Sequence, residues 1–122
     1  MSATSIKYDE IGDTLYIAFV PGEKATGIEL NEHLLLRVDK VERRAVGLTI
    51  FDYSILAQPT EVGMRSVPLT GLAVLSDDLR DLALEILLRS PLKEILAVSL
   101  YTPSLAQSVP IATVVVDARE VA

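Results

Sequence analysis

The chain has 122 residues, of which 50% are hydrophobic and 23% charged, a balance typical of one globular domain with its own core. Its formal net charge is −6 and it has no basic patch or tail, so nucleic-acid binding is not expected. It contains no cysteine, no secretory pattern and no apolar run of the ~20 residues that a membrane span needs, so we expect a soluble cytoplasmic protein without disulfides.

The first half of the chain predicts an antiparallel β-meander of about five strands, because short apolar runs are separated by turn residues. The expected strands are residues 6–8, 13–20, 25–31, 34–38 and 45–51. The second strand is apolar on both faces, which predicts that it is central and covered on both sides. Residues 9–12 are expected to form the first turn, in which Gly12 is free to take a positive φ. Gly47 predicts a bulge or a close approach of another chain segment.

Four sequence motifs follow one another at regular distances in this meander. They are Tyr8-Asp9, Asp13-x-Leu15-Tyr16-Ile17, Leu36-x-Val38-Asp39 and Val46-Gly47-Leu48-x-Ile50-x-Asp52. Together they resemble a bacterial and archaeal family called domain of unknown function 2283, over residues 6–55. The resemblance implies a small β-rich module and no chemistry, since the family has no established activity. It also hints at partner binding, because some members are thought to lie beside toxin-like genes.

One position departs from the pattern of that family. After the fourth strand the family usually carries an Asp-Gly type turn, whereas this chain has Glu42-Arg43-Arg44. The geometry of that hairpin is therefore open.

Residues 56–122 are expected to complete the core, so that 1–122 forms a single α+β domain. Residues 52–57 predict one helical turn, and residues 60–70 predict a loop across the surface. Two further strands are expected at residues 94–101 and 109–116.

The last expected strand is almost continuously apolar, which predicts burial on both sides or at an interface. Pro110 near its start predicts that this end lies at a sheet edge.

One main helix is predicted from Ser76, which can cap it, to about Arg89, before Ser90-Pro91. Its apolar arc is wider than one sheet contact needs, because Leu84 and Leu88 fall outside the main stripe. Either the C-terminal strands cover these two residues or they lie in a homodimer interface.

Carboxylates at or near the expected turns are the candidates for chemistry. They are Asp9, Asp13, Glu29, Asp39 and Asp52. If four of them, Asp9, Asp13, Asp39 and Asp52, converged, they would suit a hard divalent cation, and a buried pair would suit acid–base work. The alternative is that each accepts hydrogen bonds within its own turn or faces solvent.

Other catalytic and cofactor patterns are absent from the sequence. His33 is the only histidine and is expected to be a solvated turn residue, while Tyr8 and Tyr16 are expected to be sheet residues. The chain has no phosphate-binding loop, dinucleotide fingerprint or nucleophile elbow. We therefore expect no cofactor and no catalytic residues.

The first hypothesis is a non-enzymatic domain that acts through protein contacts, most simply as a homodimer, with an unidentified protein partner left open. The alternatives are a small-ligand or metal-binding enzyme that uses the turn carboxylates, and an antitoxin-like partner of a basic toxin.

Overall fold

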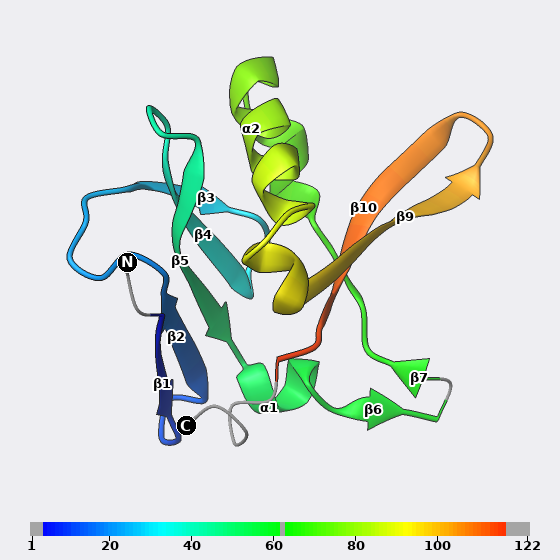
Figure 1. Ribbon diagram of the computed structural model, residues 1–122. Helices are drawn as coiled ribbons and strands as arrows, with labels where there is room; N and C mark the ends of the chain where they lie inside the picture. Colours follow the sequence, from blue (N-terminus) through cyan, green and yellow to red (C-terminus); the bar gives the residue numbers. More distant parts are fainter. Residues whose placement is uncertain (1–3, 62, 117–122) are drawn as a thin grey trace.

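The protein has the predicted α+β architecture in a computed structural model that describes residues 4–61 and 63–116 (Figure 1). The strands are β1 (Ser5–Asp9), β2 (Thr14–Ala18), β3 (Thr26–Glu29), β4 (Leu34–Asp39), β5 (Arg44–Phe51), β6 (Pro59–Thr60), β7 (Gly63–Met64), β8 (Val67–Pro68), β9 (Leu96–Ser104) and β10 (Gln107–Val114). The helices are α1 (Tyr53–Leu56) and α2 (Asp77–Leu87), with the 3-10 helices η1 (Thr70–Val74) and η2 (Leu92–Glu94). The five predicted antiparallel strands and the single helical turn are confirmed, but the strands do not form a simple meander, because β2 pairs with β5 and not with β3.

The N-terminal half forms a five-stranded antiparallel sheet in the order β1-β2-β5-β4-β3. Its central strand is β5, which pairs with β2 on one side and β4 on the other. The register places Leu48 between Ile17 and Leu36 on one face. Because side chains alternate along a strand, this register gathers the large aliphatic residues on a single face of the sheet.

That aliphatic face forms one core with the C-terminal half. The buried cluster combines Leu36 and Leu48 of the sheet with Ile86 of α2 and Val114 of β10. The five-stranded sheet and the C-terminal half of the chain therefore bury their apolar surfaces against each other.

The opposite face of the sheet is open, which corrects the expectation for the second strand. Tyr16 is 43% exposed and Phe51 is 39% exposed on that face. The β2 strand also lies next to the edge strand β1 and is not the central one. Apolar residues on both sides of a strand therefore did not indicate two covered faces here.

Gly47 lies at an irregularity of the sheet, as predicted. The register of β4 and β5 shifts between Arg37 and Val38, which leaves Val46 as the extra residue. The carbonyl of Val46 accepts hydrogen bonds from both Phe19 (2.8 Å) and Val20 (3.2 Å). A Cβ atom at Gly47 would overlap the Arg37 guanidinium and lie 2.9 Å from the backbone carbonyl oxygen of Ile17, so a side chain here would force a shift of its neighbours.

Two of the three hairpins of the sheet, β1–β2 and β4–β5, use the same turn. In the first turn the Asp9 carboxylate accepts from the backbone of Ile11 and Gly12, and Asp13 takes the left-handed conformation with φ of 51°. The positive φ of this turn is taken by Asp13 and not by Gly12, although glycine is free to adopt it.

In the second turn, the Asp39 carboxylate accepts from Val41 and Glu42, and Arg43 has φ of 53°. Because Asp39 accepts the same hydrogen bonds as Asp9, this hairpin has the same turn as the first, although Glu42-Arg43-Arg44 departs from the pattern of the family.

Residues 60–70 are more structured than the predicted loop. They contain the short strands β7 and β8, and η1 begins at their end. Leu69 is 1% exposed, and the backbone N–H of Gly71 donates to Leu30 at the end of β3. The strand β7 pairs locally with β6, whereas β8, Leu69 and Gly71 are held by long-range contacts, which leave no local periodicity in the sequence.

The main helix begins as predicted, since the Ser76 side chain accepts a hydrogen bond from the Leu79 backbone N–H. It ends at Leu87, two residues before the expected end at Arg89. None of the helices within the described residues is long and apolar enough to cross a membrane.

The C-terminal strands form a separate three-stranded sheet in the order β8-β10-β9. Pro110 therefore lies in its central strand, against the expectation of an edge. It is tolerated because β8 pairs only with Ile111 and Ala112, and only the Pro110 carbonyl is needed, as acceptor for Leu69. Val114 is buried whereas Val115 is 49% exposed, so the strand is not covered on both sides.

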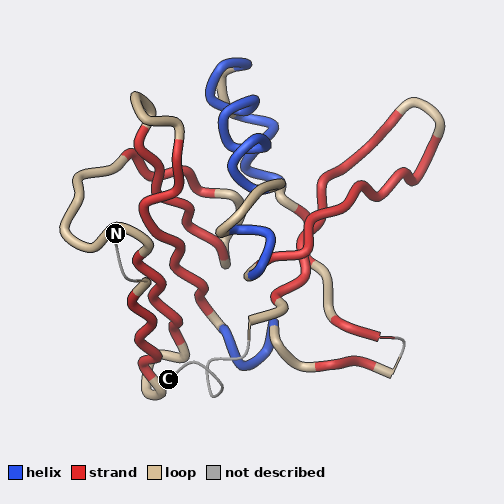
Figure 2. Tube along the Cα trace, viewed as in Figure 1, coloured by secondary structure: helices blue, strands red, loops and turns tan. Residues whose placement is uncertain are grey.

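The outer part of the β9–β10 hairpin extends away from the rest of the molecule (Figures 1 and 2). Residues 99–106 are exposed along its distal half. We call this segment, residues 97–111, the arm.

Candidate functional site

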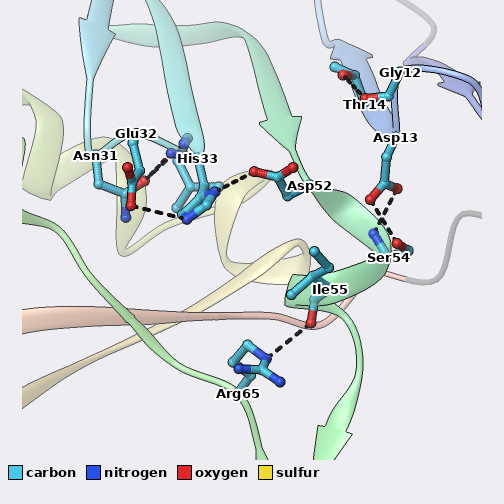
Figure 3. A network of polar contacts seen from close by, with 11 residues as sticks. Gly12, Asp13, Thr14, Asn31, Glu32, His33, Asp52, Ser54, Ile55 and Arg65 are labelled. Carbon is cyan, nitrogen blue, oxygen red and sulfur yellow. Dashed lines mark hydrogen bonds and ion pairs between the residues drawn. The ribbon is translucent and has the colours of Figure 1, made fainter.

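Polar residues of the module meet at the end of the sheet where α1 begins (Figure 3). The Asp13 carboxylate accepts hydrogen bonds from the Tyr8 hydroxyl (2.6 Å), the Ser54 backbone N–H (2.9 Å) and the Ser54 hydroxyl (2.7 Å). Its backbone carbonyl accepts from the Tyr53 N–H at 3.0 Å. Asp13 therefore joins the first hairpin to the start of α1.

This arrangement keeps Asp13 ionised and Tyr8 neutral. Desolvation raises the pKa of Asp13, but the hydrogen bonds from Tyr8 and Ser54 outweigh it and lower the pKa below its ordinary value. The hydrogen bond to Asp13, with some desolvation, raises the pKa of Tyr8 to about 12. Neither group is tuned toward neutral pH, as a general acid or base would be, so the cluster suits a structural role.

His33 is less solvated than its place at a turn predicts. Its side chain is 25% exposed, and Nδ1 lies 3.0 Å from an Asp52 oxygen while Nε2 lies 3.4 Å from a Glu32 oxygen (Figure 3). Both ring nitrogens thus lie against carboxylates, so in the described part of the chain neither is directed at a serine or threonine hydroxyl. The nucleophile–base contact of a hydrolase is not formed here.

The metal candidates have separate local roles. Asp9 and Asp39 each accept two backbone hydrogen bonds within their own turns, Asp13 holds Ser54, and Asp52 contacts His33. Within residues 4–61 and 63–116, no three or more His, Asp or Glu side chains gather in a way that could hold a metal ion. Glu29 is exposed at the edge strand β3. Asp9 and Asp39 thus act within their own turns, whereas Asp13 and Asp52 contact residues far away in the sequence.

An apolar depression lies between α2, η1 and β10. It has a volume of about 500 Å³, and its walls include Leu69, Leu72, Leu84, Val109 and Pro110. Leu84 is partly buried against the core, whereas Leu88 is 62% exposed. The structure therefore separates the two interface candidates: Leu84 lines this groove and Leu88 lies open at the end of α2.

Residues 5–54 match the family described as "Protein of unknown function (DUF2283)". The match confirms the resemblance for this segment, with nearly the boundaries expected from the motifs. Neither the curated proteins nor the solved structures contain a significant match to the chain.

The DUF2283 motifs are explained by the fold. Asp9 and Asp39 accept the hydrogen bonds of two turns, and Tyr8 and Asp13 fix the first hairpin against α1. Gly47 leaves room for the guanidinium of Arg37. The match ends before α2 and the arm begin, so the family accounts for neither the groove nor the arm.

Sequence reasoning missed the arm as a candidate site. The residues 94–101 and 109–116 indicated strands, but nothing in their alternation showed that the hairpin would leave the body of the molecule. One signal was present: from Ile95 to Val116 the chain has no charged residue.

Proposed function

We propose that this protein is a non-enzymatic cytoplasmic domain that acts through protein contacts, and that it associates with a second copy of itself. The observation that carries the proposal is the apolar surface left open in the C-terminal half. Leu88, Leu100 and Tyr101 are 62%, 66% and 56% exposed. Leu100 and Tyr101 are neighbours on β9, and exposed large apolar residues that lie together on a surface mark contact sites.

The polar cluster supports the same proposal, because its carboxylates already accept hydrogen bonds from within the protein. The carboxylates that a metal-dependent enzyme would use accept hydrogen bonds from turn backbones or from Ser54. A cation would have to compete with these bonds at each position. The DUF2283 segment thus supplies a scaffold, and the contacts are assigned to the C-terminal half.

The molar mass in solution tests the proposal. The chain has a mass of 13.3 kDa, and we expect light scattering at micromolar concentration to give twice that value. A mass of 13.3 kDa across the accessible concentration range would contradict self-association. A thermal-shift measurement with divalent cations tests the metal-binding alternative, since a bound ligand raises the melting temperature by mass action.

A further inference from the structure

The arm combines features that are unfavourable for a monomer. Residues 99–106 are exposed, and an isolated two-stranded hairpin is only marginally stable in water. It presents Leu100, Tyr101 and Leu105 to solvent, with exposed fractions of 66%, 56% and 106%. The core on which β9 and β10 rest does not extend to this part of the hairpin.

The outer strand of the arm also lacks the usual protection of a sheet edge. Soluble proteins place lysine, other charges or proline at exposed edges, because the unpaired backbone groups there pair with other chains. The edge strand β9 has no charged residue, and the whole run from Ile95 to Val116 is neutral. Its one proline, Pro103, lies beyond Tyr101, in the segment where the register with β10 shifts.

The hydrogen bonds of the hairpin show which backbone groups are unpaired. The Pro110 carbonyl accepts from Leu69, on the β8 side, so its partner Leu100 directs its own N–H and C=O away from β10. The bond from the Val115 N–H to the Ile95 carbonyl fits the same alternation. Val98 and Leu100 therefore carry the outward groups, and no bond reaches them from that side within the described residues.

We propose that β9 pairs antiparallel with β9 of a second copy of this chain, about a two-fold axis at Ser99. This proposal rests on the proposed self-association and assigns its contact. In this register the outward groups of Val98 meet those of Leu100 of the second copy. Ala97 lies opposite Tyr101 of the second copy, a small side chain against a large one.

A second copy suits this edge for an electrostatic reason. Two chains of net charge −6 repel each other, and like charges directly opposite in a sheet are destabilising. The arm is the part of the chain where two copies meet without a charged side chain on either strand. Pairing joins the two three-stranded sheets into one continuous sheet and removes both exposed edges.

Single-cysteine variants test the register, because the chain has no cysteine and any disulfide must join two copies. At the axis, Ser99 and its symmetry mate form a non-hydrogen-bonded pair with Cα atoms about 4.5 Å apart, within disulfide range. Ala97 is the matched control: it is exposed and on the same face, but its symmetry mate lies ~13 Å along the strand.

We expect Ser99→Cys to form a covalent dimer on mild oxidation on the order of tenfold faster than Ala97→Cys. A dimer by light scattering in which Ser99→Cys cross-links no faster than Ala97→Cys would overturn the pairing but leave self-association intact. A monomeric protein would overturn both self-association and the β9 pairing. The edge of β9 would then be available to a strand of another protein.

A proline variant gives a second measurement that does not depend on cysteine chemistry. Leu100→Pro removes an outward N–H while leaving the hydrogen bonds between β9 and β10, whereas Leu100→Val keeps that N–H. We expect the first variant to be a folded monomer by circular dichroism and light scattering, and the second a dimer. A folded Leu100→Pro dimer would overturn the proposal.

Discussion

At the scale of single residues, short acidic side chains decide the turns of this fold. Asp9 and Asp39 begin two of the hairpins and accept hydrogen bonds from the backbone two and three residues later. Residues with φ near 50°, Asp13 and Arg43, then close the turns without glycine. The sequence indicated the turns, because aspartate is a turn residue, but not which residue would take the left-handed conformation.

The variant Asp39→Ala tests this role. It removes the acceptor for two backbone N–H groups, and because both are exposed and can turn to water, we expect a loss of about 1 kcal/mol in the free energy of unfolding. Chemical denaturation measures the loss, with Lys40→Ala in the same turn as the control. Equal stability of the two variants would contradict the turn role of Asp39.

The Tyr8–Asp13 hydrogen bond gives a pH-dependent prediction. The pKa of Tyr8 is raised to about 12 in the folded protein, above its ordinary value of 10.0. The contribution of the Tyr8–Asp13 hydrogen bond to stability is therefore fully present below pH 10. It is lost as the pH rises through 12, since Tyr8 releases its proton at a lower pH in the unfolded chain than in the folded protein. Tyr8→Phe should lower the melting temperature at pH 8 and flatten its decline above pH 10; parallel curves for both proteins would contradict this.

At the scale of elements, the sequence pattern predicted those strands and helix ends that depend on residues near one another in the chain. The alternation of Leu34, Leu36 and Val38 gave a strand, and Ser76 before two aspartates gave the start of α2. The sequence did not show β7, β8 and η1. The strand β7 forms only a two-residue pair with β6, while β8 and η1 are ordered by contacts with distant backbone. Nor did it show that the face of Tyr16 stays open, since an uncovered face depends on where other elements pack.

The contact of η1 with β3 is one such long-range determinant. A Cβ atom at Gly71 would overlap the carbonyl oxygen of Glu29, and the Gly71 N–H donates to Leu30 at 2.7 Å. Gly71→Ala must displace backbone, so we expect it to cost about 1–3 kcal/mol of unfolding free energy.

The control for this change is Val74→Ala in the same 3-10 helix, where the side chain is 86% exposed. We expect that variant to change stability by less than about 0.5 kcal/mol in the same urea titration. Gly71→Ala with the stability of the wild type would show that η1 does not pack closely on β3.

The exposed end of α2 gives a separate prediction about contacts. Leu88 is 62% exposed at the helix end, so Leu88→Glu should keep the fold and the melting temperature of the monomer. If Leu88 belongs to the contact surface of the proposed dimer, the variant should also weaken the dimer, because it places a charge on an apolar surface. Sedimentation velocity measures the dimer fraction. An unchanged fraction would remove Leu88 from the interface and leave the edge of β9 as the contact.

Leu84 serves as the comparison, since it is partly buried against the core. Leu84→Glu should destabilise the fold itself, which a melting curve detects.

At the scale of the whole molecule, the two halves have different tasks. The DUF2283 segment builds a sheet in which the motif residues Asp9 and Asp39 accept hydrogen bonds within the turns. The helix α2 packs on the aliphatic face of this sheet. The C-terminal half completes that core and then extends a neutral arm from an acidic chain. The sequence showed the apolar strands and the wide apolar arc of the helix. The arm became visible only from the register of β9 and β10.

Hydrogen exchange of the arm, followed by NMR at high and low protein concentration, tests the central claim most directly. The amides of Val98 and Leu100 face outward and should be protected at high concentration and exchange rapidly on dilution, whereas that of Ser99, bonded to β10, should depend less on concentration. Exchange of Val98 and Leu100 that is fast and equal at both concentrations would contradict self-association through this edge.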